Sequence, residues 1–99
     1  MIDRIKSENM DLLFEAILLL ENIDECYAFF DDLCTSLELK AFSQRLQVAK
    51  LLTQQKVYNQ IVAETGASTA TVSRVNRSLK EGSDGYLTIF ERLRSKGLV

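Results

Sequence analysis

The chain lacks proline and has only four glycines among its 99 residues. Proline interrupts helical hydrogen bonding, so its absence leaves helical periodicity unbroken between the turn glycines. These glycines all lie from residue 66 onward, where helices must be short and end often. Together with 46% apolar residues, this composition predicts one all-α domain spanning residues 1–99.

Histidine is also absent, and the two cysteines stand eight residues apart. On one helix that spacing is roughly 12 Å of rise, which is too far for a disulfide. We therefore interpret Cys26 and Cys34 as small core residues. Because the chain has no histidine and no Cys-x-x-Cys pair, no metal site is predicted, and no cofactor is expected.

No run of 18 apolar residues is present, and no basic leader precedes an apolar core. The sequence therefore predicts neither a membrane span nor a signal peptide, and we expect a cytoplasmic protein without a membrane partner.

Residues 58–77, YNQIVAETGASTATVSRVNR, have the pattern of a helix-turn-helix. The first helix is predicted from about Tyr58 to Glu64, and Gly66 stands where the turn requires a positive φ. Ser68 can cap the second helix. Apolar or small residues occupy the positions at which the two helices must pack, namely Ile61, Val62, Ala67, Val72 and Val75.

The second motif helix is unusually poor in strong helix formers. Five of the six residues from Ser68 to Ser73 are serine, threonine or alanine, whereas a helix selected for stability would favour Glu, Lys and Gln. Short side chains let a helix approach base edges, and a following arginine can contact guanine. We predict base contacts by Ser68, Thr69, Ala70, Thr71, Ser73 and Arg74, and phosphate contacts by Lys56, Gln60, Asn76, Arg77 and Lys80. The alternative is an ordinary helical hairpin that binds no nucleic acid.

The charge is divided between the two parts of the chain. Its net value is −2 and the pI is about 5.1, which is unusual for a DNA-binding domain. Residues 1–38 carry ten acids and two bases, a net of −8, whereas residues 39–99 carry ten bases and four acids, a net of +6. The acidic part could weaken non-specific binding of the protein to DNA phosphates. Alternatively, these acids only keep the surface solvated, and we prefer this interpretation.

Apolar periodicity predicts six helices. A capping box at Thr35-Ser36-Leu37-Glu38 predicts the start of the third helix. Ser83 or Asp84 can cap the last one. The predicted helices cover about Ser7–Glu21, Asp24–Cys34, Thr35–Gln54, the two motif helices ending near Gly82, and a last helix carrying Tyr86, Leu87, Ile89, Phe90 and Leu93.

Each of the first three helices has an apolar stripe that is too wide to be covered by one neighbouring helix. A chain of this size has too few other helices to bury the rest. Self-association would cover them, and a two-fold dimer would place two motifs about 34 Å apart, as a palindromic duplex requires. We expect a homodimer whose core is formed by residues 1–55 and 83–99 and whose DNA-reading module is residues 57–82. The alternative is a compact monomer whose apolar patch is exposed to solvent.

The segment from Leu51 to Lys80 resembles the Trp repressor family, and more closely its YerC/YecD-type branch. Weaker likeness covers most of the remaining chain. The resemblance implies a six-helix fold, interlaced between two subunits, in which helices four and five read DNA. It is carried above all by TGASTATVSRVNRSLK, residues 65–80, with an Ala-Thr-x-(Ser/Thr)-Arg core at Ala70, Thr71, Ser73 and Arg74, and Ser78, Leu79 and Lys80 after it.

The same resemblance implies an effector pocket between the third and fifth helices, where family members bind L-tryptophan. Arg74 matches the family's arginine of the fifth helix, but Val75 stands where the family has glycine. The arginine of the third helix falls at or beside Gln44, with Arg45 one position away. The predicted effector pocket consists of Gln44, Arg45, Arg74 and Val75. Tryptophan is disfavoured as its ligand, because a valine side chain would take space that the indole needs and a displaced guanidinium group would hold the carboxylate poorly.

Three classes of function follow from these observations. The first is a dimeric DNA-binding transcriptional regulator, most simply a repressor. The second is a helical module that binds protein or RNA with the same hairpin, which the acidic pI favours. The third is an enzyme, and the absence of histidine, of a glycine-rich phosphate loop and of a nucleophile beside a base argues against it.

Overall fold

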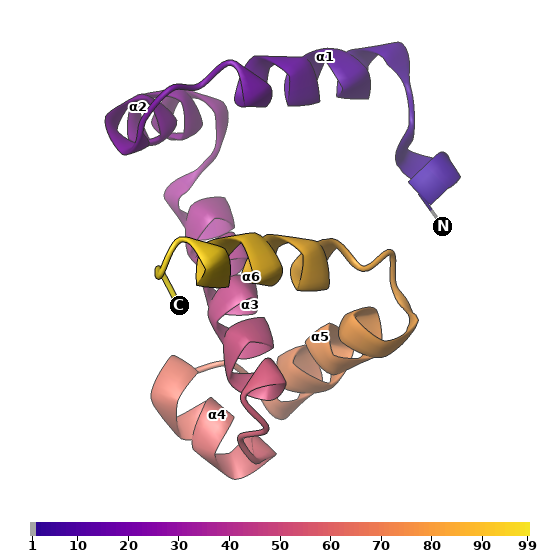
Figure 1. Cartoon of the computed structure of the whole chain (residues 1–99), viewed down its shortest axis with the longest axis vertical. Helices are drawn as coiled ribbons and strands as arrows, with labels where there is room; N and C mark the ends of the chain where they lie inside the picture. The colour runs from indigo at the N-terminus through magenta and orange to yellow at the C-terminus, as the bar shows by residue number, and fades with distance from the viewer. Residues whose placement is uncertain (1) are drawn as a thin grey trace. The chain divides into compact units, whose positions relative to one another are not determined.

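The computed structural model describes residues 2–99, which form six α-helices after one short 3-10 helix and contain no strand. The all-α, six-helix prediction is confirmed (Figure 1). The 3-10 helix was not predicted. The bounds are η1 Ile2–Ile5, α1 Glu8–Leu18, α2 Ile23–Leu33, α3 Ser36–Thr53, α4 Tyr58–Thr65, α5 Thr69–Glu81 and α6 Gly85–Ser95.

Internal contacts divide the chain into two compact units, one ending at Lys40 and the other spanning Ala41–Val99. The first unit contains α1, α2 and the start of α3. Helix α1 ends at Leu18, three residues before the predicted end. The reason is a tighter last turn, because the N–H groups of Leu19 and Leu20 donate to carbonyl groups only three residues earlier, each at 3.1 Å.

The predicted capping box at the start of α3 is confirmed. The N–H of Glu38 donates to Thr35 Oγ1 at 3.1 Å, and the N–H of Thr35 donates to Glu38 Oε1 at 2.8 Å. Two backbone donors that the helix cannot pair are thereby satisfied. Hydrogen bonding by Thr35 holds the pKa of the Glu38 carboxyl group below its ordinary value. The backbone N–H of Thr35 has the larger effect and its side chain the smaller one.

No residue from 2 to 40 is buried, although α1 and α2 are rich in large apolar side chains. Leu18, Ile23 and Tyr27 are 78%, 73% and 74% exposed. Cys26 and Cys34 are free and half-buried, so they are not the core residues that the sequence predicted. Cys34 lies beyond the end of α2 in extended backbone, so the two cysteines do not share a helix.

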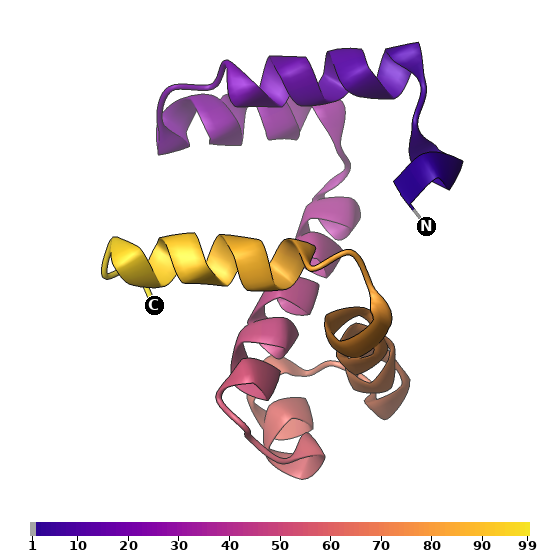
Figure 2. The same ribbon diagram turned by 45° about the vertical axis from the view of Figure 1, so that its right-hand side comes forward.

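The buried core lies entirely in the second unit. Helix α6 passes beside α3 in both views, and α4 and α5 lie near the C-terminal end of α3 (Figure 2). Phe90 brings α6 into the core at 1% exposure. This packing fixes the motif helices to α3 and α6. The buried residues are Val48, Ala49, Leu51, Ile61, Ala67, Val72, Val75 and Phe90.

Helix α6 begins where the sequence predicted, but its cap differs. Asp84 occupies the cap position with a left-handed φ of 61°, and its side chain makes no capping hydrogen bond. Its carbonyl accepts the N–H of Thr88 at 2.9 Å, which is the ordinary first hydrogen bond of the helix. The predicted position is therefore right, and the predicted side-chain cap is wrong.

Candidate nucleic-acid interface

The turn between α4 and α5 is closed by local hydrogen bonds. Gly66 has a left-handed φ of 72°, as predicted, and its N–H donates to Val62 O at 2.9 Å. The hydroxyl group of Thr65 donates to Ile61 O at 2.8 Å and accepts the N–H of Ala67 at 3.1 Å. Every residue of the turn up to Ala67 is thus bonded back to α4.

A side chain of α3 holds the same turn from outside. The amide group of Gln44, on α3, donates through Nε2 to Thr65 O at 3.2 Å, and the bond is partly buried. It satisfies a carbonyl at the end of α4 that the helix leaves without a partner. Gln44 therefore ties the turn to α3, a role that the sequence did not predict.

Helix α5 starts at a side-chain cap. Ser68 Oγ accepts the N–H of Thr71 at 3.1 Å, which confirms the predicted cap. The Ser68 hydroxyl group in turn donates to Thr71 Oγ1 at 3.1 Å. The two hydroxyl groups are therefore paired with one another at the N-terminal end of α5.

The two faces of α5 differ sharply in exposure. Val72 and Val75 are 0% and 3% exposed and pack against α3, α4 and α6. Thr71, at the edge of this face, is half-buried. The other predicted base-contacting residues are open to solvent, namely Ser68, Thr69, Ala70, Ser73 and Arg74.

The predicted phosphate-contacting residues surround the same helix. Lys56, Arg77 and Lys80 are exposed, Asn76 is half-buried, and Gln60 is exposed but donates to Glu64 Oε1 at 3.2 Å. Within residues 2–99 the single ion pair is Lys6 with Asp3 at 3.9 Å. Among these residues, the cations of the motif therefore form no ion pair with a carboxylate.

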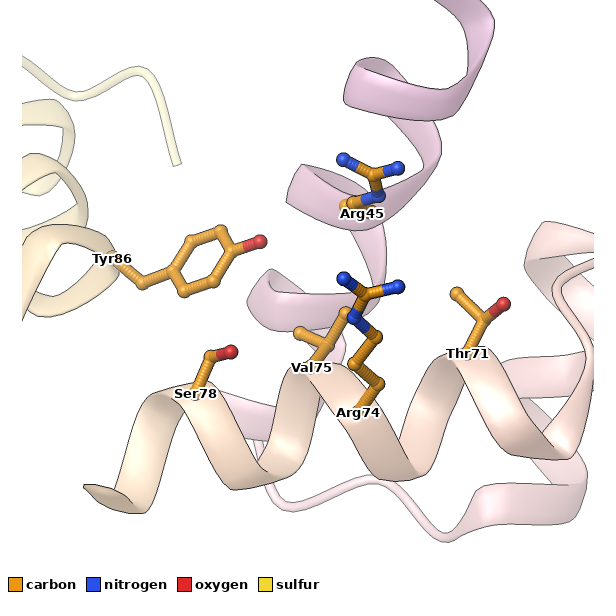
Figure 3. A pocket seen from close by; sticks show the side chains of 6 residues that line it. All are labelled: Arg45, Thr71, Arg74, Val75, Ser78 and Tyr86. Atoms are coloured by element: carbon orange, nitrogen blue, oxygen red, sulfur yellow. The ribbon is translucent and has the colours of Figure 1, made fainter. Parts of the chain in front are cut away.

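A cavity of about 250 Å³ lies between α3, α5 and α6 (Figure 3). The guanidinium groups of Arg45 and Arg74 and the hydroxyl group of Tyr86 point into it. Of the four residues predicted for an effector pocket, Arg45, Arg74 and Val75 line this cavity, and Gln44 does not. The lining residues are Arg45, Thr71, Arg74, Val75, Ser78 and Tyr86.

Two of these lining residues were missed at the sequence level. Ser78 could have been found, because it lies four residues after Arg74 and therefore on the same helical face. Tyr86 had no such signal, since it comes from α6. Its ring stacks on that of Phe90, with centroids 6.3 Å apart, and this contact connects the cavity wall to the core.

Comparison with known proteins gives concordant results. Residues 8–94 match the sequence profile of the family described as Trp repressor protein. The uncharacterised protein YerC of Bacillus subtilis (strain 168) is 47% identical over 93 residues, which cover 94% of this chain and 89% of YerC.

Two crystal structures are similar over nearly the whole chain. One, provisionally described as a Trp repressor from Staphylococcus aureus, has a TM-score of 0.90 and 54% identity, and covers 94% of this chain and 93% of its own. The other, described as a TrpR-like protein from Eubacterium eligens, has a TM-score of 0.89 and 52% identity, and covers 92% and 94%.

Proposed function

This chain belongs to the Trp repressor family, and from that premise we propose that it is a sequence-specific transcriptional regulator, most simply a repressor. It binds double-stranded DNA as a homodimer through the helix-turn-helix of α4 and α5. The observation that carries the proposal is the exposure pattern of α5, whose apolar face is buried while Thr69, Ser73 and Arg74 remain open.

Base contacts come from the first two turns of α5. Side chains as short as those of Thr69, Ala70 and Ser73 let the backbone lie close to base edges, and a threonine methyl group can contact thymine. Ser68 and Thr71, whose hydroxyl groups bond to one another, contribute from the helix start. Arg74, the remaining predicted base contact, turns its guanidinium group into the cavity beside Arg45.

Phosphate contacts flank this helix. Arg77 and Lys80 follow the base-contacting turns, Lys56 precedes α4, and Asn76 and Gln60 add neutral donors. Gln60 donates one amide N–H to Glu64, and its second N–H can donate to a phosphate oxygen. Except for Lys56, which directly precedes it, these residues lie in the proposed DNA-reading module of residues 57–82.

A second copy of the chain would cover the exposed apolar side chains of α1 and α2. Large exposed apolar patches are rare on monomers, and large apolar interfaces are typical of obligate dimers. The second unit also has a groove of about 420 Å³ between α3 and α6, lined by Leu46, Phe90, Leu93 and Val99 and by the polar residues Ser43, Gln47 and Lys50. Residues 1–55 and 83–99 would thus form the dimer core.

Substitution of an exposed leucine tests this dimer. Leu18 is 78% exposed, so on a monomer Leu18→Glu would change stability by only about 0.5 kcal/mol. In the proposed dimer the same change buries a charge and separates the subunits. Sedimentation should give a dimer for the wild type and for the exposed control Glu15→Gln, and a monomer for Leu18→Glu. A monomeric wild type would contradict the dimer.

Salt-dependent binding tests the phosphate contacts. The logarithm of the association constant should fall steeply with the logarithm of salt concentration. Arg77→Ala or Lys80→Ala should each reduce the slope by about 1.8, because each substitution removes one phosphate contact from both subunits of the dimer. Arg92→Ala, an equal charge change on α6, should leave it unchanged. Thr69→Ala or Ser73→Ala should instead alter which sequences are preferred.

A second candidate function is binding of protein or RNA by the same hairpin. It is favoured by the acidic first part of the chain, with its net charge of −8 over residues 1–38. Failure to retard any duplex at low salt would favour it over DNA binding.

The proposed regulator is cytoplasmic and does not catalyse a reaction. Among residues 2–99, no helix combines the length and hydropathy that a membrane span requires. L-tryptophan is not expected as the co-repressor, because Val75 occupies the place of the family's glycine.

A further inference from the structure

We propose that Gln44 is a positioning residue that sets the half-site spacing at which the proposed dimer reads DNA. Its side chain holds the end of α4 against α3, and it thereby fixes the angle of the α4–α5 hairpin relative to α3. The inference rests on the proposed function, because spacing specificity is a property of a DNA-binding dimer. Gln44 does not line the cavity between Arg45 and Arg74, so this role requires no ligand.

The bond from Gln44 is the only side-chain hydrogen bond within residues 2–99 that joins positions more than four residues apart. Gln44 Nε2 donates to Thr65 O at 3.2 Å, and the bond is partly buried. The core between the hairpin and α3 is apolar and includes Val48, Ile61 and Val72. Because apolar packing has no preferred direction whereas a hydrogen bond depends on its angle, Gln44 supplies the directional contact.

Helix α4 is attached to α3 at both of its ends. At its start, only the four residues 54–57 connect it to the end of α3. At its end, it is bound by Gln44, which lies nine residues before Thr53, the last residue of α3. That separation corresponds to about 14 Å along the helix axis. One attachment would let the hairpin pivot about the connection, whereas two attachments this far apart fix its direction.

The carbonyl that Gln44 binds leads directly into the reader helix. Thr65 is the last residue of α4, and three residues separate it from Thr69, the first residue of α5. The Thr65 hydroxyl group accepts the N–H of Ala67 at 3.1 Å, and the left-handed Gly66 turns the chain. Because these bonds leave the turn little freedom, fixing the Thr65 carbonyl also fixes the start of α5.

The angle of the hairpin affects DNA reading because α3 belongs to the proposed dimer core. In a two-fold dimer, rotation of each hairpin against α3 moves the two reader helices together or apart. A palindromic site requires these helices about 34 Å apart, or one duplex turn of about ten base pairs. A change of about 3.4 Å in their separation therefore corresponds to one base pair of half-site spacing.

The test uses the whole chain carrying Gln44→Met, which keeps the size of the side chain and removes its donor. Gln47→Met is the matched control, because Gln47 is an exposed glutamine on the same helix. Far-UV circular dichroism and sedimentation should show that both variants keep the fold and the oligomeric state of the wild type. A loss of one hydrogen bond is too small to unfold a domain.

The DNA arm measures binding to duplexes in which the two selected half-sites are moved apart or together by one or two base pairs. The wild type and Gln47→Met should strongly prefer one spacing. Gln44→Met should bind that spacing about 2- to 10-fold more weakly, as one lost hydrogen bond predicts, and should discriminate less against the neighbouring spacings. The dependence on salt should not change, because Gln44 is neutral and contacts no phosphate.

The second arm needs no DNA. Residual dipolar couplings of backbone amides, measured by NMR on the free protein, report how α4 and α5 are oriented relative to α3. In the wild type and in Gln47→Met, the couplings of the three helices should fit this structure as one body. In Gln44→Met, those of α4 and α5 should no longer fit together with those of α3. Gln44→Lys, which restores a donor, should bring them back toward the wild-type values.

The two arms separate the possible outcomes. A broader spacing preference together with altered couplings in Gln44→Met supports the positioning role. An equal loss of affinity at every spacing, or an unchanged spacing preference, would refute it while DNA binding by the wild type stands. If the wild type binds no duplex, the proposed function and its spacing specificity both fail. The couplings alone then show whether Gln44 orients the hairpin, and unchanged couplings would refute that as well.

Discussion

Replacement of Gly66 by alanine tests whether the turn geometry of the motif has been assigned correctly. The φ of Gly66 is 72°, and a Cβ atom built there would meet no atom within 4 Å. The cost is therefore conformational, about 1–2 kcal/mol for a left-handed non-glycine residue. Loss of unfolded-state freedom offsets about 0.4–1 kcal/mol of it.

Gly85→Ala is the matched control. A Cβ atom at Gly85 also meets nothing within 4 Å, but Gly85 is the first residue of α6 and has no positive φ. Both variants lose the same freedom in the unfolded state, so the difference between their free energies of unfolding isolates the left-handed cost. We expect Gly66→Ala to be less stable than Gly85→Ala by about 1–2 kcal/mol.

Urea unfolding followed by far-UV circular dichroism measures this difference. All variants are compared at one protein concentration, because the proposed dimer would make stability depend on concentration. Gly66→Asn should recover much of the loss, since asparagine tolerates the left-handed region. Gly82→Ala should be the most damaging change, because its Cβ atom would collide with the backbone carbonyl oxygen of Ser78. Equal stability of Gly66→Ala and Gly85→Ala would refute the turn assignment.

Three further predictions concern the caps and the cavity. Ser68→Ala removes the acceptor of the Thr71 N–H and should lower the free energy of unfolding by about 0.5–2 kcal/mol in urea titrations. The pKa of Glu38 is lowered in the folded chain, so its contribution is present above the unfolded pKa and is lost as pH falls through the folded pKa. Glu38→Gln should therefore flatten this acid-side loss in melting curves recorded across pH, and an unchanged curve would contradict the capping box. Calorimetry should detect no tight binding of L-tryptophan, because Val75 occupies the space of the family's glycine; tight binding that strengthens DNA binding would overturn this.

The features that the sequence predicted correctly are local ones. The Thr35–Glu38 box, the Ser68 cap and the left-handed Gly66 each depend on residues within three or four positions of one another. Their hydrogen bonds form whenever the neighbouring backbone is helical. The buried faces of α4 and α5 follow from periodicity in the same way.

The features that the sequence missed depend on residues far apart in the chain. The bond from Gln44 to Thr65 joins positions 21 residues apart, and Tyr86 reaches the cavity from a different helix. The apolar periodicity of a single helix carries no information about contacts between residues so far apart in the sequence. Asp84 was misjudged for another reason, because its backbone is left-handed instead of extended as in the other side-chain caps of this chain, and its side chain makes no capping hydrogen bond.

Selection of duplexes from a random pool by the purified wild-type protein, at low salt, tests the central claim most directly. If the open face of α5 reads bases in a dimer, the selected sequences should share a two-fold symmetric site whose half-sites lie about 34 Å apart, and Ser73→Ala should alter that site. Recovery of an unenriched pool by the wild type would contradict DNA reading by this helix.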